Sequence, residues 1–358
     1  MSQKINSKKT LHQIIFLFMW VFVLTLFPTN LSFSFTSENF LPPHIENEIL
    51  VKLKSNPDIL RFKFSNLTEM ESLINYYSSL PEVEYAEPNF TYQASLEPLD
   101  PYYTQQTYLT EIKAHQAWNI TTGSDDVLIA ILDSGVDIHH PDLKNNIWTN
   151  PNEIYNNGID DDENGFTDDY YGWDFVNNTN DPTPKLVTGY SPTAIKHGTV
   201  VAGVAAAQGG NNQGIAGVTW HAKIMPLRVL NHLGEGDTYT VAQAIDYARK
   251  HGADIINLSF VGQGKSQTLE NAIKNAYLAG IIIVAAAGND VENSVNLDLN
   301  PRYPVCHDGP DGENWVIGVG SIDNQNRLAS FSNFGQKCID IVTPVSYTHL
   351  TLPTKRIV

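Results

Sequence analysis

Short apolar segments that alternate with helical ones constrain the fold of this chain more than any other feature. The apolar runs cover residues 127–132, 223–229, 254–258 and 281–286. Segments with helical spacing lie between them, at residues 197–207, 240–251 and 266–280. A short, uninterrupted apolar run is typical of a strand that is buried on both faces of a parallel sheet. We therefore predict an α/β fold with a doubly wound, mostly parallel sheet, whose ligand crevice lies at the carboxyl ends of the strands.

The charge of the chain narrows the class of partner. Its 39 aspartates and glutamates outnumber 22 lysines and arginines, so the formal net charge is −17. An acidic surface is repelled by a phosphate backbone, and we expect no nucleic-acid partner. Much of the negative charge lies in one short run, residues 160–169, which is compatible with the binding of divalent cations.

The first residues have the pattern of a secretory signal. Lys4, Lys8 and Lys9 precede an almost uninterrupted apolar run over residues 14–27. This run is short for a transmembrane helix and is typical of the core of a signal peptide. We assign residues 1–35 to a signal peptide and expect a secreted, extracellular protein. Because no clear cleavage motif follows, an uncleaved anchor that keeps the protein at the cell surface is the alternative.

A small unit follows this segment. Ile49, Val51 and Leu53 alternate as in a half-buried strand, and residues 70–80 have helical spacing. A second strand is expected from Val83. We assign residues 36–96 to this small α+β unit. The proline-flanked stretch after it is typical of a linker to the larger domain.

The cysteine content excludes a disulfide framework. The chain has only two cysteines, Cys306 and Cys338, and neither lies in a CxxC or metal-ligand pattern. A single disulfide between them and two buried free thiols are both compatible with this pattern. Under neither interpretation do we expect a nucleophilic cysteine, because nothing in the sequence around the two residues resembles a site that would lower a thiol pKa.

Three polar residues stand where apolar segments begin or end. Asp133 terminates a buried strand, where a carboxylate is costly unless it is paired or hydrogen-bonded. His197 opens a helix of small residues that can pack closely on the sheet. Asn289 follows another buried strand, and its amide could donate to an oxyanion. Taken alone, each residue is more typical of a capping, packing or turn position than of a catalytic one.

Together, the three segments resemble the subtilisin-like serine proteases (subtilases) over residues 102–344 or so. The matching motifs are Asp133-Ser-Gly, His197-Gly-Thr-Val-Val-Ala-Gly and Ala-Ala-Gly-Asn289, in the chain order of that family. The resemblance implies a serine endopeptidase. In it, Asp133 would orient His197, His197 would act as general base and then general acid, and Asn289 would stabilise the oxyanion.

The resemblance also implies a peptide or protein substrate and a monomeric enzyme. The substrate would pair as an extended strand with the segment after residue 258, where Phe260 and Val261 replace the leucine and glycine usual in the family. The glycine-rich loop at 234–236 would form the opposing strand. The expected substrate-binding residues are Gly234, Gly236, Ser259, Phe260, Val261, Ala287 and Gly288.

The family's Gly-Thr-Ser motif, which bears the nucleophilic serine, does not occur in this sequence. We expect that serine beyond the end of this chain, residues 97–344 to be an incomplete peptidase domain, and residues 345–358 to be a non-native tail. Ser346 lacks the glycine and the helix of the motif. The alternative function is a catalytically inactive, subtilase-like protein that binds calcium or another partner.

The acidic run predicts a Ca²⁺ site. Asp160, Asp162 and Asn164 alternate ahead of a glycine, and Asp168 follows, so several hard oxygen ligands would surround one point. The twelfth position of the run is Tyr171 instead of glutamate, so the run is not a complete EF-hand. A solvated acidic turn is the alternative. Acidic loops in this position bind calcium in many subtilases, which the resemblance carries over to this run.

The resemblance implies two further features. One is a second calcium site made by Asp142, Asn211 and the backbone carbonyls of Gln213 and Ile215. The other concerns the unit at 36–96, which is similar to the inhibitory prosegments of subtilases. The chain's own prosegment would then be an intramolecular inhibitor, removed by cleavage before about residue 100. An unrelated small domain is the alternative.

Overall fold

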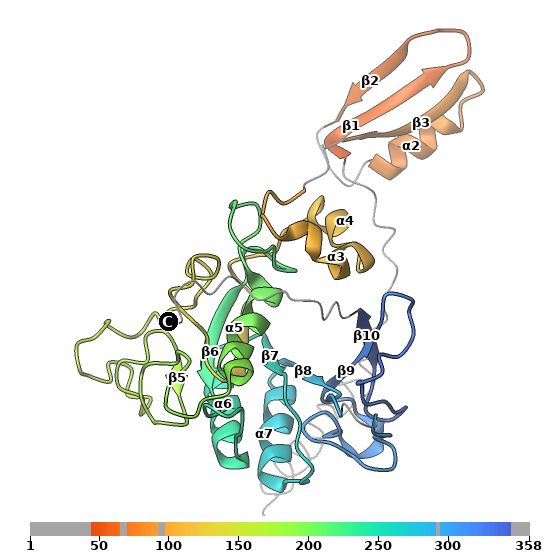
Figure 1. Cartoon of the computed structure of the whole chain (residues 1–358). Coiled ribbons are helices and arrows are strands. Elements are labelled where there is room, and N and C mark those ends of the chain that lie inside the picture. Colours follow the sequence, from red (N-terminus) through yellow and green to blue (C-terminus); the bar gives the residue numbers. More distant parts are fainter. Residues whose placement is uncertain (1–43, 65–69, 92–96, 291–293, 345–358) are drawn as a thin grey trace, which may run out of the picture. The chain divides into compact units, whose positions relative to one another are not determined.

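A computed structural model describes residues 44–64, 70–91, 97–290 and 294–344. The predicted signal peptide and the predicted tail at 345–358 lie outside these residues. Contacts divide the chain into two compact units, residues 1–92 and 93–358, and each is described by itself (Figure 1). None of the helices among the described residues is long and apolar enough to cross a membrane.

The small unit is a three-stranded antiparallel sheet with one helix. Its strands are β1 (His44–Leu53), β2 (Ile59–Lys63) and β3 (Val83–Phe90), in the order β2-β1-β3. Helix α2 (Met70–Ser78) contributes Met70 to a core with Ile49, Val51 and Val83. Strand β2 was not predicted, because four of its five residues are exposed and it carries no alternating apolar pattern.

The large unit contains a seven-stranded sheet in the order β10-β9-β8-β7-β4-β6-β5, with every pairing parallel. This confirms the predicted doubly wound α/β fold. The first strand along the chain, β4, lies inside the sheet with β6 on one side and β7 on the other, so the strand order reverses there. The strands are β4 (Leu128–Asp133), β5 (Trp173–Asp174), β6 (Lys223–Arg228), β7 (Ile255–Leu258), β8 (Ile282–Ala286), β9 (Ile317–Ile322) and β10 (Ile341–Pro344).

In the described part of the large unit, three long helices cover the sheet, and the short helical segments lie before β4 and between β8 and β9. The long helices are α5 (Pro192–Ala206), α6 (Thr238–Lys250) and α7 (Gln267–Leu278). The short ones are η2 (Tyr103–Gln105), α3 (Thr107–Glu111), α4 (Ala114–Trp118) and η3 (Pro310–Gly312).

Strand β4 shows why the sheet needs cover on both faces. All six of its residues are buried, and successive side chains enter different cores. Ala130 and Leu132 pack in the core shared with α6 and α7, whereas Ile129 and Ile131 pack in the core shared with α5. A strand between two cores must be apolar throughout, which is the pattern that the sequence displays.

Helix α5 begins earlier than the sequence pattern predicted. We expected it to start at His197, but it starts at Pro192, so that His197 lies in its second turn. Ser191 caps the helix by accepting a hydrogen bond from the backbone N–H of Ala194. Serine followed by proline is a helix-start signal. A search for apolar periodicity did not detect it, because Pro192 and Thr193 are exposed and only Ile195 of the first turn is a large buried apolar residue.

The two cysteines form a disulfide, Cys306–Cys338. The sequence left this pairing and two free thiols open, and the structure decides for the disulfide. It joins the segment before β9 to the segment before β10, which are 32 residues apart in the chain. The bond therefore cross-links two connections at the β10 side of the sheet.

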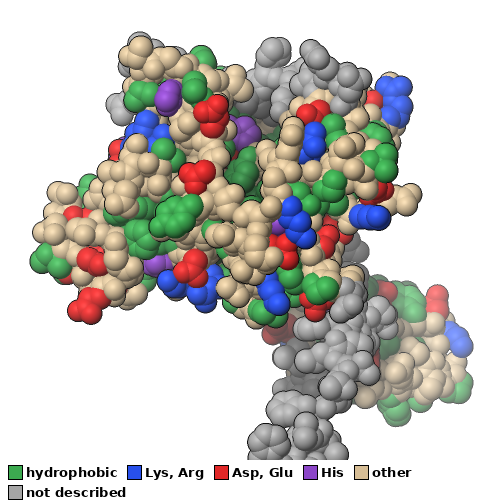
Figure 2. Space-filling model, turned by 90° about the horizontal axis from the view of Figure 1, so that it is seen from below, with side chains coloured by type: hydrophobic (Ala, Val, Ile, Leu, Met, Phe, Trp, Pro, Cys, Tyr) green, Lys and Arg blue, Asp and Glu red, His purple; other side chains and the backbone are tan. Residues whose placement is uncertain are grey.

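Charged side chains are mixed on the surface. Figure 2 shows Lys and Arg interspersed with Asp and Glu on one face of the molecule, with no continuous basic patch on that face.

Candidate active site and acidic cluster

Asp133 is the last residue of β4, at the carboxyl edge of the sheet. Its side chain is fully buried, and Oδ1 accepts a hydrogen bond of 2.6 Å from the backbone N–H of Ser134. A buried carboxylate is costly without partners, and one amide donor satisfies only part of its hydrogen-bonding capacity. The remaining partner comes from helix α5.

His197 supplies that partner. Its Nδ1 lies 2.9 Å from Oδ1 and 2.8 Å from Oδ2 of Asp133. The hydrogen bond to Asp133 raises the pKa of His197 above its ordinary value, and burial opposes this effect. The His197 side chain nevertheless keeps 41% of its surface exposed. The imidazole is thus bound through Nδ1 to a buried carboxylate, and Nε2 is the nitrogen left to exchange a proton with a bound substrate.

Gly198 allows α5 to approach the end of β4 this closely. A Cβ built at Gly198 would lie 2.4 Å from the carbonyl oxygen of Gly135 and 2.9 Å from Cβ of Asp133. No side chain fits in that space. The His-Gly pair of the sequence motif therefore has a packing reason: the glycine allows the contact that the histidine uses.

Asn289 lies just after the end of β8, at the same edge of the sheet. Strand β7 pairs in parallel with both β4 and β8, so the carboxyl ends of all three strands lie at one edge. Asn289 is exposed, and it forms an isolated antiparallel bridge with Ser332. An exposed amide at this edge is available to donate to a group bound there.

Three predicted substrate-binding residues, Ser259, Phe260 and Val261, directly follow β7 and are half-buried. They therefore lie between the ends of β4 and β8. The next residue, Gly262, exchanges two backbone hydrogen bonds with Tyr303, of 2.7 and 2.9 Å. This pairing anchors the segment beyond the predicted substrate strand.

The other predicted substrate-binding residues lie on either side of this segment. Gly234 and Gly236 are exposed in the loop after β6, and a Cβ at Gly234 would lie 3.1 Å from that of Ala194 in α5. Ala287 and Gly288 are buried just after β8. The structure thus gathers the predicted catalytic and substrate-binding residues at the carboxyl edge, where the fold predicts a ligand crevice.

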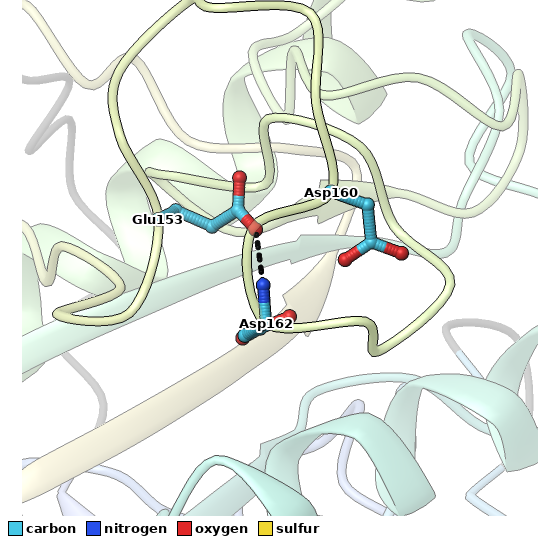
Figure 3. A group of neighbouring side chains, drawn as sticks. All are labelled: Glu153, Asp160 and Asp162. Carbon is cyan, nitrogen blue, oxygen red and sulfur yellow. Dashed lines mark hydrogen bonds between the residues drawn. The ribbon is translucent and has the colours of Figure 1, made fainter.

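An acidic cluster lies in the long loop between β4 and β5. Glu153, Asp160 and Asp162 each offer a carboxylate oxygen, and these oxygens lie within 4.8 Å of one another (Figure 3). Glu153 Oε1 accepts hydrogen bonds from the backbone N–H groups of Asp161 and Asp162, of 2.9 and 3.4 Å. Oε2 of Glu153 is buried and has no hydrogen-bond partner. Burial raises the pKa of the Glu153 carboxyl group, and the nearby carboxylates add to the effect.

A buried carboxylate oxygen without a partner fits a cation site, since a hard cation would supply the missing interaction. The sequence pattern missed Glu153, which lies outside the acidic run and joins it only through the fold. Of the other predicted ligands, Asn164 donates through Nδ2 to Asp169, and Asp168 accepts hydrogen bonds from the backbone N–H groups of Asn157 and Gly158. Asp168 does not belong to the cluster of three.

The second predicted calcium site is gathered as well. Asp142 accepts hydrogen bonds of 2.9 Å from Asn211 Nδ2 and from the backbone N–H of Ile215. The backbone N–H of Gln213 donates a hydrogen bond to Oδ1 of Asn211.

Burial, with a smaller contribution from Asp100, raises the pKa of Asp142 to about 6. Asp100, which the sequence analysis missed, accepts hydrogen bonds from the same loop. Here the predicted ligand oxygens Asp142 Oδ1 and Oδ2 and Asn211 Oδ1 already accept hydrogen bonds, unlike Oε2 of Glu153.

A buried aspartate that holds a half-exposed histidine at the carboxyl edge of a doubly wound sheet is the arrangement of hydrolases that activate a nucleophile through an Asp–His pair. Residues 124–356 match the profile of the subtilase family of S8 peptidases. The chain belongs to this family, and the resemblance found in its motifs is confirmed.

The chain is similar over most of its length to two proteins named as a serine proteinase and a halolysin. It is 35% identical over 285 residues to the thermophilic serine proteinase of Bacillus sp. (strain AK1), an alignment that covers 79% of this chain and 60% of that protein. It is 36% identical over 274 residues to halolysin of Haloferax mediterranei, covering 76% of this chain and 45% of halolysin. The chain thus spans about half the length of these relatives.

A solved structure supports the fold. The chain matches a protease from Pseudoalteromonas arctica with a TM-score of 0.53 and 30% identity, over 69% of this chain and 72% of that one.

Proposed function

We propose that this chain is part of a secreted serine endopeptidase that hydrolyses peptide bonds with an Asp–His–Ser triad. The observation that carries the proposal is the contact of 2.8 Å between His197 Nδ1 and the buried carboxylate of Asp133. Asp133 holds the tautomer that leaves Nε2 free to accept a proton, and it stabilises the imidazolium that forms. His197 then returns the proton to the leaving amine.

Asn289 is the third residue of the proposed catalytic site that the structure describes, after Asp133 and His197. Its amide donates a hydrogen bond to the oxyanion of the tetrahedral intermediate. Removal of such a donor from an enzyme of this kind raises the activation free energy by about 3–4 kcal/mol. The nucleophilic serine is proposed to belong to a segment that follows residue 344 in the parent protein, because the sequence contains no Gly-Thr-Ser motif.

The proposed substrate is an extended peptide. It adds as a strand beside Ser259–Val261, with the loop at Gly234–Gly236 on its other side, through main-chain hydrogen bonds. Ala287 and Gly288 form the floor of the pocket that accepts a substrate side chain.

The proposal is tested with the full-length protein. The coding DNA is read beyond the codon for Pro344, the complete precursor is expressed, and the product is assayed with fluorogenic peptides and a fluorophosphonate label. Cleavage together with labelling of a serine is the expected result. A correctly folded full-length protein that neither cleaves nor labels would overturn the proposal and favour an inactive binding protein.

We also propose that the small unit at residues 36–96 is an inhibitory prosegment. Support comes from its position ahead of the peptidase domain and from its compact three-stranded sheet with helix α2. N-terminal sequencing of the mature enzyme tests this, since a removed prosegment predicts a first residue between Thr91 and Asp100.

The proposed secretion rests on the basic and apolar start of the chain, and the distribution of the enzyme between medium and cells tests it.

Calcium is the cation proposed for the cluster of Glu153, Asp160 and Asp162. Carboxylate oxygens at a polar loop are ligands typical of Ca²⁺, and the unpartnered Oε2 of Glu153 supports a bound cation there. When bound, the ion would cross-link the loop between β4 and β5 and resist local unfolding. A second Ca²⁺ site is proposed at Asp142 and Asn211, with the backbone carbonyls of Gln213 and Ile215, and its support is that the fold brings Asp142 and Asn211 into contact. Unlike Oε2 of Glu153, the side-chain oxygens of Asp142 and Asn211 already accept hydrogen bonds.

A further inference from the structure

Asn333 lies against the loop that carries Asn289, and no part of the proposed machinery accounts for it. Its side chain is fully buried, in the connection between β9 and β10. A buried amide is costly unless its donors and acceptor are all satisfied, so its partners indicate what it holds.

The partners of Asn333 lie on both sides of Asn289. Nδ2 donates to the carbonyl oxygen of Ala287 at 3.0 Å and to Oδ2 of Asp290 at 2.8 Å. The backbone N–H of Asn333 donates to the carbonyl oxygen of Gly288 at 3.0 Å. Three near neighbours of the predicted oxyanion donor, two before it and one after, are therefore bonded to one residue.

The same side chain also reaches the far end of the loop. Oδ1 of Asn333 accepts a hydrogen bond of 2.9 Å from the backbone N–H of Val295. The neighbouring residue, Ser332, is fully buried and forms the antiparallel bridge with Asn289 itself. Both donors and the acceptor of the Asn333 amide are thus used to hold one loop.

The packing at Gly288 shows how close this contact is. Gly288 has a φ of +95°, and a Cβ built there would lie 2.8 Å from Nδ2 of Asn333 and 2.8 Å from a methyl group of Val261. The loop can lie against Asn333 only with glycine at this position. Asn289, in contrast, is exposed, and the fold positions its amide through the backbone on either side.

We propose that Asn333 is the positioning residue of the oxyanion donor: its buried amide fixes the backbone of Ala287–Asp290 so that the Asn289 side chain points at the reacting carbonyl. This inference rests on the proposed function. It does not make Asn333 a catalytic residue, since its side-chain hydrogen bonds go to the loop and not to a bound substrate. An oxyanion donor acts in the transition state and not on the bound substrate, so its misplacement lowers kcat and leaves KM nearly unchanged.

The shape and polarity of asparagine are specific to this role. Serine at position 333 is too short to reach both acceptors. Aspartate would turn a carboxylate toward the carbonyl oxygen of Ala287 and the carboxylate of Asp290, replacing two hydrogen bonds by repulsion.

The test compares Asn333→Ser with Asn146→Ser in the full-length enzyme. Asn146 is also buried, and its Nδ2 donates to two carbonyl oxygens, those of Ala206 and Trp220, at 2.9 and 2.8 Å. Both substitutions remove a buried amide, but only one of these amides holds the Asn289 loop. We expect kcat to fall at least about ten-fold in Asn333→Ser, since displacements of about 1 Å can cost two orders of magnitude. KM should change little, and Asn146→Ser should keep the parent kcat despite a similar loss of thermal stability.

Asp290 provides a second variant that does not threaten folding, because its side chain is 42% exposed. Asp290→Ala removes one acceptor of Asn333 and should lower kcat several-fold, whereas Asp290→Asn keeps an acceptor oxygen and should restore most of it. Affinity for a peptide aldehyde, which forms a tetrahedral adduct, should fall in parallel with kcat.

Two outcomes distinguish failure of the inference about Asn333 from failure of the proposed function. If the parent enzyme cleaves peptides but Asn333→Ser and Asp290→Ala keep kcat within about two-fold, Asn333 has only a structural role and the inference is wrong. If the folded parent shows no activity and no serine labelling, the proposed function fails, and the role of Asn333 fails with it.

Discussion

His197 Nδ1 lies 2.9 and 2.8 Å from the two carboxylate oxygens of Asp133, which is completely buried at the end of β4. The two residues are 64 positions apart in the chain, and the parallel sheet and helix α5 bring them together. The hydrogen bond to Asp133, with a smaller contribution from the charge of that carboxylate, raises the pKa of His197, and burial opposes the shift. This contact is the basis of the first two predictions.

Asp133→Asn should lower kcat of the full-length enzyme by about four orders of magnitude, because an amide favours the wrong imidazole tautomer. KM should change far less. Asp137→Asn is the matched control, since it removes a nearby carboxylate that does not bond to His197 and should leave kcat close to that of the parent. Steady-state kinetics with a fluorogenic peptide measure both. Equal losses in the two variants would contradict the assigned roles.

The pH dependence of activity should follow the raised pKa of His197. His197 must be neutral to act as a base, so kcat/KM should rise with pH through an acid limb whose midpoint lies above the ordinary histidine value of about 6.5. In Asp133→Asn the residual activity should show a lower midpoint, because the stabilising carboxylate charge is gone. An unchanged midpoint in that variant would argue against Asp133 as the cause.

Calcium should raise the melting temperature of the protein, and a chelator should lower it. At a Ca²⁺ concentration of about 100 Kd the expected stabilisation is about 2.7 kcal/mol for one site. Glu153→Gln and Asp160→Asn should reduce the calcium response, whereas Asp126→Asn, which removes an exposed carboxylate outside the cluster, should not. Asp142→Asn tests the second site separately. A full calcium response in Glu153→Gln would exclude this carboxylate as a ligand.

Removal of the Cys306–Cys338 disulfide should destabilise the peptidase domain. For residues 32 apart in the chain, loss of the cross-link is expected to cost about 3–4 kcal/mol through the entropy of the unfolded chain. The double variant Cys306→Ala/Cys338→Ala should therefore melt at a lower temperature. A reductant should lower the melting temperature of the parent but not that of the variant, and a response of both would point to a different cause.

Buried His307 should make the protein sensitive to acid. Burial lowers the pKa of His307 to about 4, with Glu270 opposing and Lys265 adding to the shift. In the unfolded chain the value is near about 6.5, so stability is complete above that pH and declines as pH falls toward 4, by up to about 3 kcal/mol. Denaturant unfolding at about pH 7 and about pH 4.5, on either side of the unfolded-state value, measures the difference. His307→Gln should reduce it, and His221→Gln, at an exposed position, should not.

Much of the fold was predictable because buried parallel strands carry a strong local signal. The strands predicted at 127–132, 223–229, 254–258 and 281–286 correspond to β4, β6, β7 and β8 within about one residue at each end. The exposed edge strand β2 and the start of α5, where Pro192 and Thr193 are exposed, have no such signal. Strand β2 was therefore missed, and α5 was predicted to start too late. Apolar periodicity reports burial, and it cannot report elements that stay in water.

The functional residues also fall into two groups: those that local sequence motifs predicted and those that only the fold brings together. The motifs around Asp133, His197 and Asn289 are local in sequence, and the family they indicate is confirmed by the match over residues 124–356. Their individual roles remain predictions. Glu153 and Asn333 were not found, because each acts on residues that only the folded chain brings close.

The sequence by itself determined the α/β class, the family and the residues that meet at the carboxyl edge, because all of these depend on short apolar runs and local motifs. The tertiary structure alone decided that Cys306 and Cys338 are paired, that Glu153 joins the acidic run, and that Asn333 holds the loop of Asn289. The physical reason is distance along the chain. Contacts between residues far apart in sequence depend on how the strands and their connections pack, and no local pattern encodes that packing.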